Sequence, residues 1–210
     1  MDKLKLIHHS LADWEFEPNH RYYITADYSI SSPSSLATPT PAGANYYYYC
    51  YLKYELAHNV PNGRFIAYFR QQEAWLLFRI FFRQQTPLHH LGNQNGYVLI
   101  YAPGDPGVQI FRYIAAVQTY IGHINVPLYD RNTWRKLKFD FYQYITGAPM
   151  TTLRIEIFQE IAGAWVSQGY VEDGVNAFAN SPENRIGFAL WGPDPPYPSL
   201  IDDIEIWKQA

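Results

Sequence analysis

The sequence predicts an all-β fold, a sandwich of two antiparallel sheets. Three observations predict it: apolar and polar residues alternate with a period of two in several segments, turn residues recur between these segments, and sustained helical periodicity is almost absent. The chain has 210 residues, which fits a single β-domain covering residues 1–210.

The first strands expected along the chain are residues 4–7 and 22–29. Residues 31–45 combine Pro, Gly, Ser and Thr, so we expect a loop there. The tyrosine-rich segment YYYYCYLKYEL then reads as a strand over residues 46–56. Its alternation places Tyr47, Tyr49 and Tyr51 on the same face as two charged residues, which predicts that this face is the wetter one.

The middle of the chain continues the pattern with strands expected at 64–70, 75–83, 97–101, 108–114 and 117–124. Turn residues separate them, including the sequence PGDPG at 103–107. In the strand at 75–83, Phe78 and its alternate neighbours form an apolar face. Trp75, Arg79 and Arg83 fall on the opposite face, which therefore mixes aromatic residues with arginine.

The last eighty residues give the sharpest pattern, with strands expected at 134–142, 151–160, 184–191 and 199–208. In the second of these, Leu153, Ile155 and Ile157 alternate with Arg154 and Glu156, a period that fits a half-buried strand and excludes a helix. An antiparallel sheet with one solvated face follows.

This region also carries a resemblance. Trp134 opens a strand, Gly163 precedes Trp165 and Val166, and the sequences RIGFALW and IDDIEIW follow. Together they resemble the C-terminal half of concanavalin A-like jelly rolls, a superfamily that includes laminin-G-like domains, legume-type lectins, carbohydrate-binding modules, and some glycoside hydrolases and polysaccharide lyases. In the first half, DWEFE, SISSPSSL and NGYVLIY occur in the expected order. The resemblance implies a two-sheet antiparallel jelly-roll sandwich and does not single out one activity.

Composition bears on the partners. Aromatic residues make up 18% of the chain and charged residues 17%, so we expect some aromatic surface to be exposed. The net charge is −3 and there is no run of Lys or Arg, which argues against nucleic acid and against an anionic membrane as partners. Cys50 is the only cysteine, so no disulfide forms within the chain.

The sequence shows no signal peptide and no apolar stretch long enough for a transmembrane helix. A lectin-like domain without a leader is expected either in a particle assembled inside a cell or outside the cell after lysis. Virion proteins fit this description, and a phage virion is the expected location.

The sequence predicts no enzyme. Glycoside hydrolysis needs two carboxyl groups across the scissile bond, and hydrolases of the resembled superfamily carry them on a Glu-x-Asp-x-Glu strand that is missing here. The nearest pairs are Glu156 with Glu160 and Asp203 with Glu205, which read as charges on solvated strand faces. We therefore name no catalytic residue.

No cofactor is expected, apart from one candidate calcium site implied by the resemblance. Its ligands would be Asp13, Glu15 and Asp202 or Asp203, because calcium prefers several hard oxygen ligands. The alternative is that these acids lie at strand ends and pair with Arg185 or Lys208.

The remaining candidates are aromatic residues mixed with arginine. If their two strands share a sheet, the residues form one surface; they are Tyr47, Tyr49, Tyr51, Trp75, Arg79 and Arg83. Three interpretations stay open: a glycan platform on which sugar rings stack, a protein–protein interface, or a second small core under long loops. A further candidate is the proline-rich loop with Trp191 and Tyr197, which costs little to order on binding.

The function expected from these observations is a non-catalytic lectin-like protein of a virion, with a structural, decoration or adhesion role. Its partners would be capsid or tail proteins, a glycan, or both, and we expect it to be an oligomer or part of a larger assembly. The alternative is a carbohydrate-binding module, or a domain related to glycoside hydrolases or lyases, that acts on polysaccharide.

Overall fold

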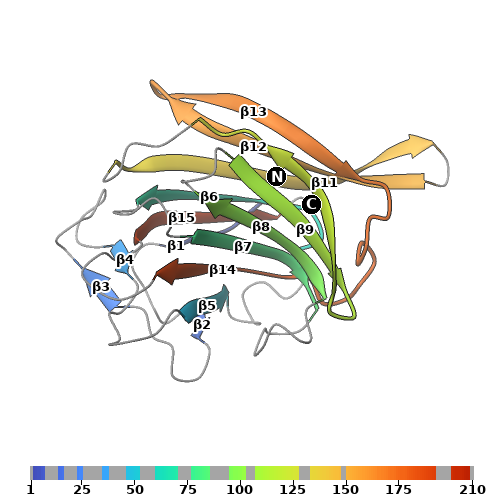
Figure 1. The fold of residues 1–210 in the computed structure, drawn as a ribbon, viewed down its shortest axis with the longest axis horizontal. Coiled ribbons are helices and arrows are strands. Elements are labelled where there is room, and N and C mark those ends of the chain that lie inside the picture. The colour runs from blue at the N-terminus through green and yellow to red at the C-terminus, as the bar shows by residue number, and fades with distance from the viewer. Residues whose placement is uncertain are drawn as a thin grey trace.

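The computed structural model describes residues 2–7, 14–16, 23–25, 35–37, 46–52, 60–70, 77–85, 95–102, 107–127, 133–147, 150–192 and 200–208. Side chains are described from Val60 onward within these ranges, except at positions 102, 146, 147, 150, 191 and 192. The described chain forms two antiparallel sheets that pack face to face as an all-β jelly-roll sandwich (Figure 1). None of these residues belongs to a helix long and apolar enough to cross a membrane.

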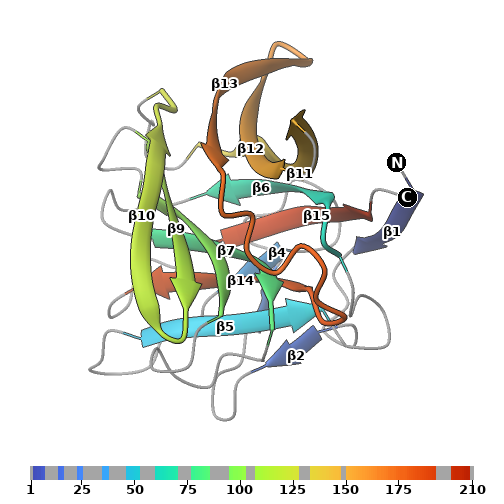
Figure 2. The ribbon, with the colours of Figure 1, turned by 90° about the vertical axis from the view of Figure 1, so that its right-hand side faces the viewer.

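Sheet A contains eight strands within the described residues. In spatial order they are β13 (Ala164–Asp173), β12 (Met150–Ile161), β11 (Arg135–Gly147), β6 (Gly63–Arg70), β15 (Leu200–Lys208), β4 (Ser35–Ala37) and β3 (Tyr23–Thr25), with β1 (Asp2–Ile7) also paired to β15. The pairing of β1 with β15 brings the two ends of the chain side by side (Figure 2).

Sheet B contains seven strands in the part of the chain that the structure describes. In spatial order they are β10 (Val117–Ile124), β9 (Gly107–Ile114), β8 (Gly96–Ala102), β7 (Leu77–Gln84), β14 (Arg185–Gly192), β5 (Tyr46–Leu52) and β2 (Trp14–Phe16). Strand β14 lies between β7 and β5, so a segment near the C-terminus joins two strands from the first half of the chain.

Aromatic rings from both sheets fill the core between them. The Phe69 ring of sheet A meets the Phe78 ring of sheet B edge-on at 4.6 Å between centroids. The Phe82 ring lies 4.5 Å from that of Phe141. Burial of each such side chain contributes about 1.5–3 kcal/mol, so these contacts are a main source of the stability of the sandwich.

The two sheets also meet along one side, where the edge strands β10 and β13 come into contact without pairing (Figure 2). A Cβ atom placed on Gly122 of β10 would lie 2.7 Å from the side chain of Val171 in β13. This close approach explains why a residue without a side chain occurs there.

The four C-terminal strands expected from the alternation are confirmed as β11, β12, β14 and β15. Two features differ from expectation. The structure adds β13 between β12 and β14; most of β13 is exposed or half-buried, so it lacks a clear apolar alternation. The expectation that residues 31–45 form only loop is wrong, because the short strand β4 pairs with β15 and β3.

Candidate functional site

The structure confirms that the two strands of the predicted aromatic surface share a sheet. Backbone register places Tyr49 of β5 opposite Ala189 of β14, which in turn lies opposite Arg79 of β7. Tyr47 and Tyr51 occupy register positions on either side of Tyr49. These neighbours therefore come from three adjacent strands of sheet B.

One further member of that prediction, in β14, lies in the same sheet. Trp191 lies opposite Tyr47 and Leu77 in register. Trp75 and Tyr197 lie outside the described residues.

The outer face of sheet B carries a small second core. Phe81 and Ala189 are fully buried, and Val98 and Tyr113 are almost fully buried. All four face away from the main core. Ile100 packs against this cluster. This small core lies next to the predicted aromatic surface. The three interpretations of that surface stay open, because the side chains of Tyr47, Tyr49 and Tyr51 are not among those described.

Arg83 does not lie on the outer face with Arg79, and this part of the prediction is wrong. The register between β7 and β14 shifts near the end of β7, and Arg83 has a φ of 51°, as expected at a β-bulge. The bulge reverses the alternation and turns the Arg83 side chain into the interior, where it is 0% exposed.

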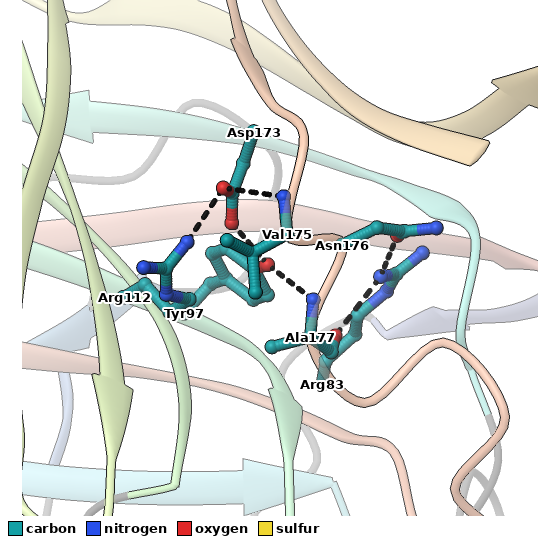
Figure 3. Close-up of polar contacts among 7 residues, drawn as sticks. All are labelled: Arg83, Tyr97, Arg112, Asp173, Val175, Asn176 and Ala177. Carbon is teal, nitrogen blue, oxygen red and sulfur yellow. Dashed lines mark hydrogen bonds and ion pairs between the residues drawn. The ribbon is translucent and has the colours of Figure 1, made fainter. Parts of the chain in front are cut away.

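The Arg83 guanidinium is surrounded by hydrogen-bond acceptors. It donates to the Asn176 side chain at 2.6 Å and to the Ala177 carbonyl at 3.2 Å (Figure 3). It also donates to the Pro61 carbonyl at 2.6 Å and to the Asn62 side chain at 3.1 Å. Burial lowers the pKa of Arg83 to about 10, so these bonds offset a cost of desolvation.

Asp173 is the centre of a second group of buried contacts beside Arg83. Its carboxylate accepts hydrogen bonds from the Tyr97 hydroxyl and the Arg112 guanidinium, both at 2.6 Å, and from the backbone N–H of Val175 at 3.1 Å (Figure 3). The Tyr97 hydroxyl in turn accepts from the N–H of Ala177 at 2.9 Å. Burial, together with the hydrogen bond to Asp173, raises the pKa of Tyr97.

These contacts join sheet B to the segment that follows β13. Arg83 and Asp173 are both buried, so the group is not a surface for a ligand. We assign it a structural role, which is to hold the connection from β13 to β14 against the sandwich.

A different surface, on sheet A, combines aromatic rings with cations at close range. On β11, Leu137, Phe139 and Phe141 enter the core, so Lys136 and Lys138 point to the outer face. We call the outer face of β6, β11, β12 and β13 the aromatic–cation face. Its members are Tyr68, Lys136, Lys138, Tyr144, Arg154, Phe158, Trp165 and Tyr170.

One end of this face is built around Trp165. The Lys138 ammonium lies 3.6 Å from the centroid of the Phe158 ring and 5.0 Å from that of Trp165. The Lys136 ammonium lies between Trp165, at 5.7 Å, and Tyr68, at 4.9 Å. Burial under these rings lowers the pKa of Lys138, while the charge of Asp140 acts in the opposite direction.

The other end is built around Arg154. Its guanidinium lies 4.0 Å from the centroid of the Tyr170 ring and 5.0 Å from that of Tyr144. Glu172 forms an ion pair with Arg154, with a carboxylate oxygen 2.5 Å from Nη2. The same carboxylate accepts a hydrogen bond from the Tyr144 hydroxyl at 2.6 Å. Tyr170 remains 53% exposed.

Two further carboxylates on this face, those of Asp140 and Glu156, accept hydrogen bonds from neighbouring side chains. Asp140 accepts two bonds from Arg64, Nε to Oδ1 at 2.6 Å and Nη2 to Oδ2 at 2.7 Å. Glu156 accepts a bond from the Ser167 hydroxyl at 2.9 Å. Such pairs fix the side chains in one arrangement before any ligand arrives.

The contacts of Glu172 predict a pH dependence. Its pKa is held below the usual value for a glutamate, first by the hydrogen bond from Tyr144 and then by Arg154. A carboxyl group whose pKa is depressed in the folded state stabilises that state above its unfolded pKa, and this contribution is lost as the pH falls. A ¹³C NMR titration should show Glu172 titrating below an ordinary glutamate, and Tyr144→Phe should raise its pKa. An unchanged pKa in Tyr144→Phe would contradict the assignment.

In the sequence, charged residues of this face such as Arg154 and Glu156 predict only an ordinary solvated strand face. The available signal was the presence of aromatic residues at outward positions of the same strands, such as Phe158 in β12. Trp165 and Tyr170 gave no clear signal, because strand β13 was not expected.

The candidate calcium ligands are divided between the sheets. Glu15 lies in β2 of sheet B, while Asp202 and Asp203 lie in β15 of sheet A. Asp202 is buried and accepts the backbone N–H of Asp203 at 2.8 Å. Asp13 lies outside the described residues. Within the residues that are described, no group of three or more His, Cys, Asp or Glu side chains could hold a metal ion, and the calcium site stays a prediction.

No protein-family model and no protein of curated function matches the sequence. Solved structures are similar to it. A legume lectin-like domain from Entamoeba histolytica has a TM-score of 0.65 at 10% identity, and the match covers 100% of this chain and 99% of that one. The carbohydrate-binding module CBM66 from Bacillus subtilis has a TM-score of 0.56 at 12% identity, covering 97% and 100%.

A third similar structure is an enzyme, the marine PL-14 alginate lyase from Aplysia kurodai, with a TM-score of 0.62 at 9% identity and 100% of both chains covered. These similarities confirm the predicted concanavalin A-like jelly-roll fold. At such low identity they establish the fold alone.

Proposed function

We propose that this protein, which has a concanavalin A-like jelly-roll fold, is a non-catalytic, lectin-like carbohydrate-binding protein. Its binding surface is the aromatic–cation face. The observation that carries the proposal is the alternation of rings and charged groups on that face. Trp165 and Tyr170 both lie in β13. Trp165 is near Lys138 of β11, two strands away, and Tyr170 is near Arg154 of the neighbouring β12.

The chemistry of this face suits a sugar. The C–H face of a pyranose stacks on an aromatic ring, and its hydroxyl groups need charged or polar partners around the ring edge. The ring–cation contacts and ion pairs hold the side chains in place, so little conformational entropy is lost on binding. Support also comes from the structural similarity to a lectin-like domain and a carbohydrate-binding module.

A non-catalytic role is supported by the state of the carboxylates. Asp140 and Glu156 are opposite each other in register, which is close enough to raise the question of hydrolysis. However, the Arg64 guanidinium donates to both carboxylate oxygens of Asp140, so this carboxylate already has a partner within the protein. A glycosidic hydrolase is among the similar structures, at 12% identity and a TM-score of 0.56. The protein should therefore be assayed for release of oligosaccharides from polysaccharide, and such release would contradict the non-catalytic role.

The finer expectation, a role in a phage virion as a structural, decoration or adhesion protein, stays a prediction. It implies that the protein sediments with particles and assembles with capsid or tail proteins. A protein that behaves as a monomer and fails to co-sediment with any particle would contradict it.

The first test of the proposal is a glycan array on the purified protein and its variants. We expect Trp165→Ala and Tyr170→Ala each to weaken binding about tenfold or more, because each loses an aromatic stacking contact and the apolar area it buries. The matched control is Tyr120→Ala: Tyr120 is also an exposed tyrosine, at 57%, but lies on β10 of the other sheet.

Two further arms separate the alternatives. The double variant Tyr49→Ala with Trp75→Ala tests the face predicted from sequence, and loss of binding there with no effect of Trp165→Ala would move the site to sheet B. Addition of EDTA tests the predicted calcium site. Absence of binding to every glycan would contradict the proposed function.

A further inference from the structure

The aromatic–cation face has two separate positions for a sugar ring, and both depend on a β-bulge. Trp165 and Tyr170 are five residues apart in β13, an odd spacing that would place them on opposite faces of a regular strand. The register shifts between them: Ile157 pairs with Gly169, and Phe158 pairs with Ser167. One additional residue, Gln168, is thereby accommodated in β13.

The bulge returns both aromatic residues to the same face. Trp165 is opposite Glu160 in register, and Tyr170 is opposite Glu156. These two glutamates are four residues apart in β12, so both lie on the outer face. The bulge also contains Gly169, whose φ of 128° is rarely adopted by residues with a side chain.

The pairing of β12 with β13 gives the distance between the positions of Trp165 and Tyr170. Four residues of β12 separate them, which at about 3.3 Å per residue amounts to roughly 13 Å along the strand. The two rings also have separate cation partners, Lys138 at one position and Arg154 at the other. A single monosaccharide stacked on Trp165 therefore does not reach Tyr170.

We infer that the ligand is an extended polysaccharide chain that lies along β12 and β13 and stacks on Trp165 and Tyr170 at the same time. This inference rests on the proposed function and adds the class of ligand, a chain of several sugars instead of a terminal sugar. Two linked contacts of this kind strengthen each other, because binding at the first raises the local concentration of the chain at the second.

The test is the dependence of affinity on chain length. Isothermal titration calorimetry would use size-fractionated oligosaccharides, from disaccharide to decasaccharide, of alginate as an acidic series and of xylan as a neutral series, with the strongest polysaccharide from the array as a third series. In the native protein we expect a step of about tenfold or more in Kd once the chain reaches both rings, since linked contacts gain at least this much.

Alanine variants test whether the step in affinity with chain length depends on the two rings. Tyr170→Ala and Trp165→Ala should each remove the step and leave a weak affinity that no longer depends on length. Tyr120→Ala should keep both the step and its position in the series.

The outcomes separate the inference from the proposal on which it rests. If short oligosaccharides bind as tightly as long ones, and only one of the two variants loses affinity, the extended-chain inference is overturned while carbohydrate binding stands. If none of the three series binds at any length, the proposed function itself fails.

Discussion

Replacement of Arg83 by alanine is expected to lower the free energy of unfolding by about 4 kcal/mol. The guanidinium is completely buried and donates to four acceptors, among them the Asn176 side chain and the Ala177 carbonyl. The alanine variant removes this donor from all four acceptors, of which the Asn62 oxygen still accepts the N–H of Gln143. Each buried group that is left unsatisfied costs about 1–3 kcal/mol. Chemical denaturation followed by tryptophan fluorescence measures the loss.

Two variants serve as controls for Arg83→Ala. Arg83→Lys keeps a charge but has fewer donors in a less rigid arrangement, so we expect an intermediate loss of stability. Arg154→Ala removes an arginine from the solvated face of sheet A and should cost less than about 1 kcal/mol. If Arg83→Ala proves no more destabilising than Arg154→Ala, the structural role assigned to the buried arginine is wrong.

Replacement of Asp173 by alanine is the second large effect, with an expected loss of about 3–5 kcal/mol in the free energy of unfolding. The substitution removes the partner of a largely buried guanidinium, that of Arg112, and leaves the Tyr97 hydroxyl without its acceptor. The backbone N–H of Val175 also loses a bond, so the connection to β14 should become more mobile. Faster amide hydrogen exchange at residues 174–184 would report this directly.

The neighbouring residue provides a matched control for this variant. Glu172→Ala removes an exposed carboxylate one position earlier and should destabilise the protein far less than Asp173→Ala, because an exposed ion pair contributes little. A double-mutant cycle between Asp173→Asn and Tyr97→Phe should show a coupling energy of about 0.5–3 kcal/mol, because the two side chains share a hydrogen bond. Additive effects would show that the bond contributes little to stability.

The alternation of apolar and polar residues predicts most of the fold, because a strand with one buried face requires apolar residues at every second position. Leu153, Ile155 and Ile157 belong to the core, as their alternation with polar residues required. The same logic fails wherever a bulge adds a residue to a strand. At Arg83 the bulge moves a predicted surface residue into the interior, and at Gly169 it brings two aromatic residues onto one face.

The candidate site was harder to predict for a related reason. Strand β13 lies at an edge of its sheet and has few buried residues, so no apolar period marks it. The site depends on contacts between strands, such as that of Lys138 with Trp165, which are 27 positions apart in the chain (165 − 138). Charges with such partners look the same in the sequence as charges exposed to water.

The contact between β10 and β13 bears on how the protein avoids aggregation. A strand at the edge of a sheet exposes unpaired backbone groups that can recruit another chain and begin a fibre. Here the two long edge strands of the sandwich face each other, as the proximity of Gly122 and Val171 shows. At the opposite ends of the two sheets, the described edge strands are shorter. Strands β2 and β3 have three residues each, and β1, which is paired to β15, has six. Within the described residues, the longest edge strands of the sandwich are therefore shielded from a growing cross-β assembly, in a chain that is rich in tyrosine and phenylalanine.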